Sequence, residues 1–204
     1  MPNGRGIDSN AIVVEMVKEA NNKFKKKLPG VFNHILSTGS IEADWHTTLF
    51  SMLPKSGNLD DPTNWRPIAI LPIFYKIFSR LLYNRLKVFL HHEQSDDQYA
   101  FQEGKRIDDV FCILENLIGK SIEFKVPLWM ASLDMRKAFD RIEFIPLFQA
   151  LREQGVPESY IALLTAFYVN QHGSVNGSMT FEINRGVEQS MNQSIITRAP
   201  PNGA

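Results

Sequence analysis

The chain has 204 residues, of which 44% are hydrophobic and 22% charged, and its formal net charge at pH 7 is zero. This balance is typical of a globular protein with one sizeable core, so any basic surface for nucleic acid must be local. The single cysteine, Cys112, excludes an internal disulfide framework and a cysteine-based zinc site, and we expect it to be a small core residue. No apolar run reaches membrane-spanning length and the polar start is unlike a secretory signal, so we expect a soluble, intracellular protein without a membrane partner.

The first third of the chain is expected to be mainly helical. Apolar residues keep helical spacing behind Ser9, a capping residue, and three consecutive lysines at 25–27 suit a helix C-terminus. Pro29 and Gly30 interrupt this pattern, so a second short helix is expected over residues 31–36. A strand is predicted over residues 49–53, and turn residues follow it.

A basic, aromatic stretch follows, with no acidic residue between Pro62 and His92. After Pro72 the pattern is that of an amphipathic helix. Side chains at steps of four, three and four share one face of this helix: Lys76, Arg80, Tyr83 and Lys87. A cationic stripe beside an aromatic ring suits a phosphate backbone, and the alternative is an ordinary solvated polar face.

The remaining helices and a hairpin are predicted from period and turn chemistry. Helices are expected over residues 108–118, 146–154 and 158–168, and the last two are joined through Gly155-Val156-Pro157. Alternation over residues 173–186 around Asn176-Gly177 predicts a β-hairpin.

Residues 128–142 carry the strongest chemical signal in the chain. The apolar run over 128–133 follows a proline and predicts a buried strand, at whose end stands Asp134. A helical turn and a second carboxylate, Asp140, come next. A carboxylate at the edge of a buried strand is costly unless it is paired or binds a hard cation such as magnesium. The alternative is that Asp134 caps the turn and that Asp140 pairs with Arg136 or Lys137.

From about Gly6 to Gln189 the chain resembles the reverse transcriptases of non-LTR (LINE-type) retrotransposons. The resemblance rests on six sequence words in the family's order: NWRPIAIL (64–71), YKIFSRLLYNRL (75–86), QYAFQEGKR (98–106), SLDMRKAFDRI (132–142), GVPESYIALLTAFY (155–168) and RGVEQ (185–189). It implies an α+β fold, with the helical fingers lobe and a small antiparallel palm sheet of a right-hand polymerase. The expected divisions are an N-terminal and fingers region at 1–127, a partial palm at 128–189, and a disordered, non-homologous tail at 190–204.

The resemblance also implies RNA-directed DNA polymerisation, with template RNA, a DNA primer, deoxynucleoside triphosphates and Mg²⁺. Asp134 then corresponds to a catalytic metal ligand of the first palm motif. Phe139 corresponds to the steric gate that excludes a ribose 2′-OH, and the backbone amides after Asp134 would face the triphosphate. Further nucleotide contacts are implied for Arg66, Lys105, Arg106 and Gln189.

Three departures from the family pattern limit this implication. Ala100-Phe101-Gln102 stands where the family usually has Gly-Phe-Arg, so a phosphate-neutralising cation is missing. Unrelated sequence begins at Ser190, and no two adjacent aspartates follow Asp134. We therefore expect the chain alone to be inactive as a polymerase. The alternatives are a non-catalytic RNA-binding remnant and a decayed fragment without a biochemical role.

Overall fold

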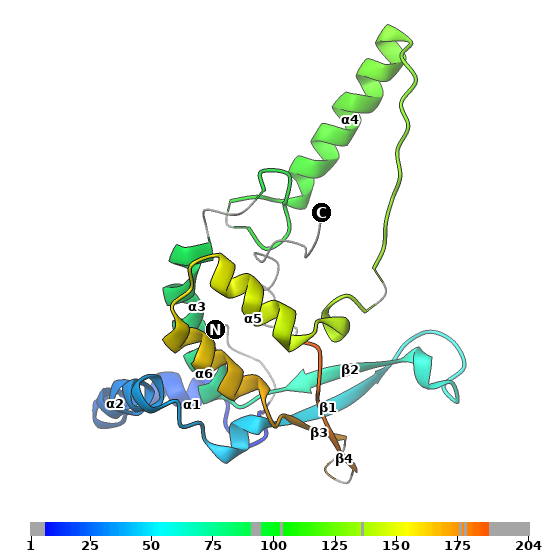
Figure 1. Ribbon diagram of the computed structural model, residues 1–204. Coiled ribbons are helices and arrows are strands. Elements are labelled where there is room, and N and C mark those ends of the chain that lie inside the picture. The colour runs from blue at the N-terminus through cyan, green and yellow to red at the C-terminus, as the bar shows by residue number, and fades with distance from the viewer. Residues whose placement is uncertain are drawn as a thin grey trace.

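The computed structural model describes residues 7–90, 95–102, 104–135, 137–175, 177 and 179–187 (Figure 1). Its helices are α1 (Val14–Glu19), α2 (Asn22–Thr38), α3 (Ile73–Leu90), α4 (Ile107–Phe124), α5 (Phe144–Glu153) and α6 (Glu158–Tyr168). Its strands are β1 (Thr47–Pro54), β2 (Trp65–Ile70), β3 (His172–Val175) and β4 (Met179–Glu182). The mixture of helices with one small sheet agrees with the predicted α+β class. None of the described helices is both long and apolar enough to cross a membrane.

The sheet has the strand order β2-β1-β3-β4 and is mixed, whereas a small antiparallel sheet was expected. β1 pairs antiparallel with β2 and parallel with β3, for which Thr47 lies opposite His172. Parallel pairing is possible because the long helical stretch between β1 and β3 returns the chain to the same end of the sheet. β2 was not predicted, since Pro67 weakens its strand pattern; as an edge strand it tolerates the missing N–H.

The predicted hairpin is confirmed by β3 and β4, which pair antiparallel around Gly177, whose φ is +72°. A Cβ placed on Gly173 of β3 would lie 2.3 Å from the ring of Phe181, so a larger residue there would displace this ring. That ring also stacks on Phe50 of β1, with the centroids 5.8 Å apart. The hairpin is therefore anchored to the centre of the sheet through one aromatic side chain.

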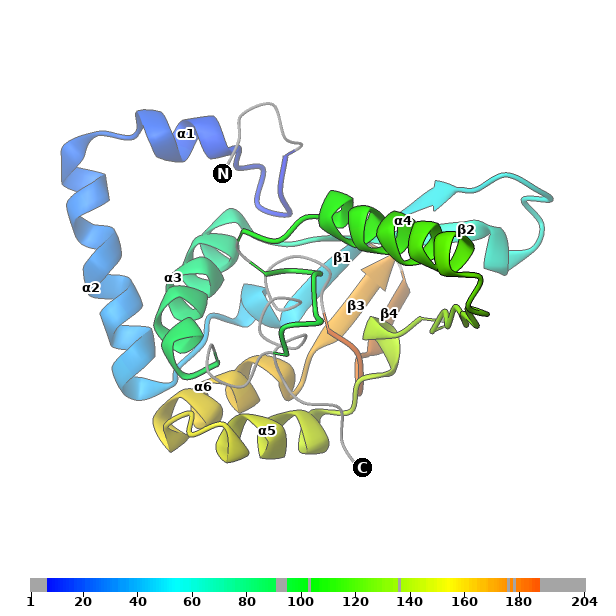
Figure 2. The same cartoon turned by 90° about the horizontal axis from the view of Figure 1, so that it is seen from above.

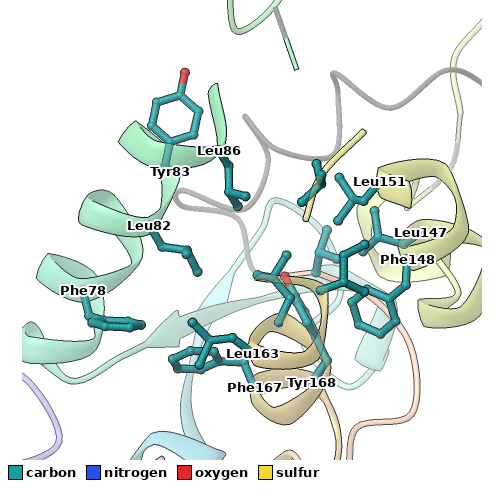
Figure 3. Packing of buried hydrophobic residues seen from close by; sticks show 14 of the residues in the cluster. Phe78, Leu82, Tyr83, Leu86, Leu147, Phe148, Leu151, Leu163, Phe167 and Tyr168 are labelled. Atoms are coloured by element: carbon teal, nitrogen blue, oxygen red, sulfur yellow. The ribbon is translucent and has the colours of Figure 1, made fainter. Parts of the chain in front are cut away.

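Three helices, α3, α5 and α6, form the main core (Figure 3). The predicted apolar face of α3 is confirmed by Phe78 and Leu86, which are both fully buried. Phe78 contacts Phe32 of α2 at 5.5 Å and Phe167 of α6 at 5.6 Å between ring centroids. Figure 2 shows the resulting arrangement, in which α3 lies between α2 and the helix pair α5–α6. Trp45 closes the core by stacking on Phe167 at 6.0 Å.

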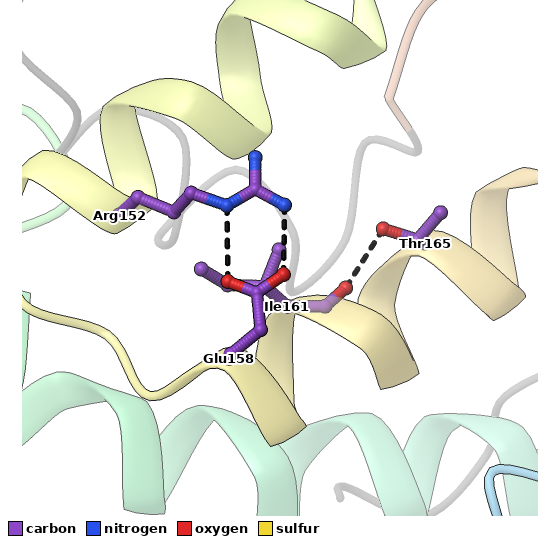
Figure 4. A network of polar contacts seen from close by, with 4 residues as sticks. All are labelled: Arg152, Glu158, Ile161 and Thr165. Atoms are coloured by element: carbon purple, nitrogen blue, oxygen red, sulfur yellow. Dashed lines mark hydrogen bonds and ion pairs between the residues drawn. The ribbon is translucent and has the colours of Figure 1, made fainter.

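The turn between α5 and α6 is built as predicted, and α6 begins and ends at the predicted residues. Gly155 has a φ of +78°, which ends α5, and Val156 is buried. On the surface, the Arg152 guanidinium donates two hydrogen bonds to the Glu158 carboxylate, at 3.0 and 2.8 Å (Figure 4). These bonds hold the pKa of the Glu158 carboxyl below its usual value and raise the pKa of Arg152.

The N-terminal helices differ from the prediction in where they break. The expected single helix divides after α1, because the Asn21 side chain accepts a hydrogen bond from the Phe24 N–H and so begins α2. α2 then runs through Pro29 to Thr38, where two shorter helices were expected. Pro29 is exposed, so the carbonyl that its missing N–H leaves without a partner can bind water.

α4 and the extended segment 126–135, which together we call the projecting arm, stand clear of this core (Figure 1). No residue of α4 is buried, and Cys112 is exposed, contrary to the core position expected for it. The buried strand predicted over 128–133 is also wrong. Leu133 is 91% exposed and these residues join none of the described strands, so the apolar run lacks the neighbouring strand that burial requires.

Candidate functional site

Phe139 belongs to the SLDMRKAFDRI word and contacts a residue of the QYAFQEGKR word. It begins a 3-10 turn, Phe139–Arg141, and its ring packs partly buried against the main core. The ring of Phe101, from the QYAFQEGKR word, meets it edge-on at 6.2 Å and 90°. This geometry is the favourable one for an aromatic pair, because the edge of one ring faces the electron-rich face of the other. The fold therefore holds Phe139 between the core and the turn at 95–102.

A third word reaches the same turn through the main chain. The Val187 N–H donates to the Phe139 carbonyl at 3.1 Å, and the Gly186 N–H donates to the Ile142 carbonyl at 2.8 Å. Gly186 has a φ of +92°, and a Cβ there would lie 3.1 Å from the Cα and carbonyl oxygen of Asp140. Only glycine fits this close approach, and Val187 behind it is buried in the core.

Two non-glycine residues with positive φ flank the turn. Phe101 has a φ of 59° and Lys137 a φ of 52°. The left-handed conformation costs a residue with a side chain roughly 1–3 kcal/mol, and such strain persists only where surrounding contacts impose it. The Phe101–Phe139 contact is such a constraint on one side of the turn.

Lys105 and Arg106 were both predicted as nucleotide contacts, and the structure gives a partner to the side chain of Lys105 and to the main chain of Arg106. The Lys105 ammonium donates a hydrogen bond to the Asp96 carbonyl and lies 5.0 Å from the centre of the Tyr99 ring. The Arg106 N–H donates to the Asp109 carboxylate at 2.8 Å, at the start of α4. The Lys105 side chain therefore joins the end of this turn to its beginning at Asp96 and Tyr99. The Arg106 guanidinium, in contrast, is exposed.

The predicted cations of α3 and β2 lie on separate elements. Arg66 is exposed on the edge strand β2, opposite Leu53. On α3, Arg80 and Lys87 are exposed and Lys76 is half-buried. Tyr83, predicted on the same face, is buried to 9% exposure, and the Arg80 guanidinium lies 5.3 Å from its ring centre. The buried Tyr83 ring therefore contacts the exposed Arg80 side chain from the side of the core.

Asp134 does not lie in a metal site that the described residues complete. Its side chain is exposed in the projecting arm, beyond the residues that were expected to form a strand. Among the residues that the structure describes, no group of three or more His, Cys, Asp or Glu side chains could hold a metal ion. The described residues therefore supply at most part of the ligands of a bound Mg²⁺. Arg136 and Gln189, as well as the expected tail at 190–204, lie outside the described residues.

The contact partners of Phe139 were not among the predicted site residues. Phe101 and Val187 stand in words that the sequence analysis singled out, but the roles in those words were assigned to neighbouring charged or amide side chains. A glycine in RGVEQ was the available signal, since a fixed glycine marks a positive φ or a close backbone approach. The edge-on pairing of Phe101 with Phe139 depends on tertiary structure and has no signal in the sequence.

With this geometry established, comparison with known families identifies the class of protein. Residues 53–197 match the family model described as reverse transcriptase (RNA-dependent DNA polymerase). The match covers more than half of the chain, and the chain belongs to this family.

The relatives place it more narrowly, among the reverse transcriptases of non-LTR retrotransposons. It is 28% identical over 171 residues to the "Retrovirus-related Pol polyprotein from type-1 retrotransposable element R2" of Popillia japonica, covering 81% of this chain and 24% of that protein. It is 25% identical to the "Transposon TX1 uncharacterized 149 kDa protein" of Xenopus laevis, over 93% of this chain and 15% of that protein. The "RNA-directed DNA polymerase from mobile element jockey" of Drosophila melanogaster is 26% identical over 65% of the chain and 15% of its own length. The chain thus spans less than a quarter of the length of these relatives.

Proposed function

We propose that this chain is the template-binding fingers and upper palm of an RNA-directed DNA polymerase, acting on template RNA, a DNA primer and deoxynucleoside triphosphates. The family match over residues 53–197 carries the proposal. The names of relatives such as the jockey element's RNA-directed DNA polymerase support it.

α3 supplies the template-binding surface in this proposal. Arg80 and Lys87 are exposed on one face of the helix, and Lys76 is half-buried there. The Arg80 guanidinium is supported by the buried Tyr83 ring, so its position is restrained before RNA binds and less side-chain entropy is lost on binding. No acidic residue stands in α3 to oppose these cations.

The Phe139 turn is the nucleotide side of the same proposal. Its ring, held by Phe101 and the core, is the group that would lie under the sugar of an incoming deoxynucleotide. Its backbone is held by the Gly186 and Val187 N–H groups. A rigid ring discriminates against a 2′-OH because it does not yield to the additional oxygen atom.

Polymerisation itself requires more than the described residues supply. Magnesium dehydrates reluctantly and is usually held by one or two carboxylates together with substrate phosphates, in a site of near-octahedral geometry. Asp134 is exposed, and no cluster of ligating side chains accompanies it among the described residues. We therefore propose RNA binding without primer extension as the behaviour of the 204-residue chain.

A salt titration of RNA binding tests the template-binding part. Each phosphate that a cation neutralises contributes about 0.7–0.9 to the slope of log affinity against log salt. Replacing Lys76, Arg80 and Lys87 together by Ala should weaken binding to single-stranded RNA and flatten this slope.

The matched control removes the same charge from α2, by replacing the exposed Lys23, Lys26 and Lys27 with Ala. We expect this control to retain most of the affinity and of the slope. Equal losses in the two triple variants would contradict the assignment of template binding to α3, and unchanged binding of the α3 variant would do so as well.

A further inference from the structure

The helix to which we assign template binding, α3, begins without a cap from its own neighbourhood in the sequence. None of residues 68–72 carries a side-chain oxygen that could accept a hydrogen bond from the first N–H groups of the helix. These N–H groups lack acceptors within any helix and need another partner. Ile73, the first residue of α3, is 2% exposed, so its surroundings offer little water for this purpose.

The carboxylate of Asp8, 65 residues earlier in the chain, supplies the missing acceptor. Its Oδ2 accepts a hydrogen bond from the Ile73 N–H at 2.7 Å. Its Oδ1 accepts two more, from the N–H groups of Asn10 at 2.9 Å and Ile12 at 2.7 Å. The residue is only 8% exposed, and these three main-chain donors offset the cost of burying a carboxylate. Its negative charge also suits the N-terminal end of the helix dipole.

The loop that carries Asp8 is closed by its own hydrogen bonds. The Asp8 N–H donates to the Ile12 carbonyl at 3.0 Å, and the Ala11 N–H donates to the Asp8 carbonyl at 3.2 Å. Ala11 has a φ of 59°, a strained conformation that persists only where surrounding contacts impose it. A second contact from the N-terminal region falls on the same turn of α3, where the Phe24 and Phe74 ring centroids lie 6.1 Å apart. The N-terminal region therefore holds the start of α3 at two points.

We propose that Asp8 is a positioning residue for template binding, and that it acts through the first turn of α3. This role rests on the proposed function, in which α3 binds the template. Lys76 lies in the turn that begins at Ile73, so the cap determines where this cation stands. Lys87 lies in the last turn, beyond the fully buried Phe78, and its position depends on the core instead. Asp8 therefore acts on one end of the cationic face.

Hydrogen exchange of Asp8→Asn tests the cap with little change of shape. An amide has one oxygen, so its NH₂ group must face a main-chain donor on one side. Toward the loop it would face two N–H groups and toward α3 only one, so we expect α3 to lose its cap. Amide exchange over residues 73–77 should become about five- to thirtyfold faster, and exchange over 86–90 should not change. Unchanged exchange over 73–77 would overturn the proposal, whether or not the chain binds RNA.

The matched control is Asp61→Asn, the same change at an exposed carboxylate. The Asp61 side chain accepts a hydrogen bond from the Thr63 N–H at 2.8 Å, in the loop between β1 and β2. This variant should leave exchange over residues 73–77 as it is and should not weaken RNA binding. Equal acceleration of exchange over 73–77 in both variants would overturn the proposal, because the effect would then not come from the cap.

Binding of single-stranded RNA tests the consequence for the template. Removing a negative charge by itself strengthens binding to RNA, whereas we expect Asp8→Asn to weaken it. The slope of log affinity against log salt should fall by about 0.7–0.9, the contribution of one phosphate. A smaller folded fraction alone would reduce the bound amount and leave this slope unchanged. After Lys76→Ala, Asp8→Asn should cause no further loss of affinity, whereas its effect should add to that of Lys87→Ala.

Two results would overturn the role of Asp8 in template binding. The first is a loss of RNA affinity in the triple variant of Lys76, Arg80 and Lys87 that Asp8→Asn does not share. The second is a loss from Asp8→Asn that adds fully to that of Lys76→Ala. RNA binding that the triple variant leaves unchanged would instead contradict the proposed function, and exchange over residues 73–77 distinguishes that failure from a failure of the cap.

Discussion

The core formed by α3, α5 and α6 and the projecting arm contain similar side chains in opposite surroundings. Phe167 in the core is 4% exposed and contacts Trp45, Tyr75 and Phe78, whereas Phe111 on α4 is 57% exposed. Both helices have an apolar face at helical spacing. The difference is that the α6 face meets other helices of the same chain and the α4 face does not.

This difference shows that an apolar pattern in the sequence predicts which face of a helix is apolar. It does not predict which other element covers that face. Helices α3, α5 and α6 bury one another in a single core, so their patterns are satisfied within the chain. The pattern of the projecting arm is equally clear, and in the described residues it lacks a covering element.

The largest expected effect compares the two regions by the same substitution. Phe167→Ala should lower the free energy of unfolding by about 3–5 kcal/mol, since it removes a buried ring and leaves a cavity. Phe111→Ala, also measured by urea unfolding, should change it by less than about 0.5 kcal/mol. Similar losses for the two variants would contradict the contrast between core and arm.

A smaller effect is expected where the arm rejoins the body of the protein. Gly186→Ala places a side chain at a φ of +92° and against the Asp140 backbone, which should cost about 1–3 kcal/mol of unfolding free energy. Gly104→Ala is the matched control. It also has a positive φ, +85°, but a Cβ there meets no atom within 4 Å. If the two variants are equally destabilised, the close approach at Asp140 adds nothing to the backbone strain.

The smallest effect concerns the surface pair that joins α5 to α6. Because Arg152 lowers the pKa of the Glu158 carboxyl in the folded state, the pair stabilises the protein above the unfolded pKa of that carboxyl. This stabilisation is lost as the pH falls through the lowered pKa. Glu158→Gln should therefore reduce stability slightly at neutral pH and converge with the unaltered protein in acid. A difference for Glu158→Gln that persists at low pH would contradict the linkage.

The elements that could be predicted from the sequence are those whose signals are local. α6 and the β3–β4 hairpin follow from a helical period between turn residues and from an Asn-Gly turn. β2 could not be predicted in the same way, because Pro67 is compatible with a strand only at the edge position that the tertiary structure provides. The strand expected over 128–133 was wrong for the related reason that a strand requires a neighbour.

In the candidate site, too, local signals could be predicted from the sequence, whereas contacts between distant residues could not. Phe139 could be singled out from its spacing to Asp134 and its place in a family word. Its contacts with Phe101 and Val187 join residues 38 and 48 positions away along the chain, and no local pattern specifies such distances. Lys105 matched the family pattern in sequence, but its hydrogen bond to the Asp96 carbonyl was visible only in the structure.

A primer-extension assay tests the central claim most directly, that residues 1–204 bind template RNA without forming a complete polymerase site. The assay supplies template RNA, an annealed DNA primer, all four deoxynucleoside triphosphates and Mg²⁺, with RNA binding measured on the same protein preparation. We predict salt-sensitive RNA binding and no extension, both for the unaltered chain and for Asp134→Ala. Extension by the unaltered chain that Asp134→Ala abolishes would contradict the account, because it would show that the metal site is complete.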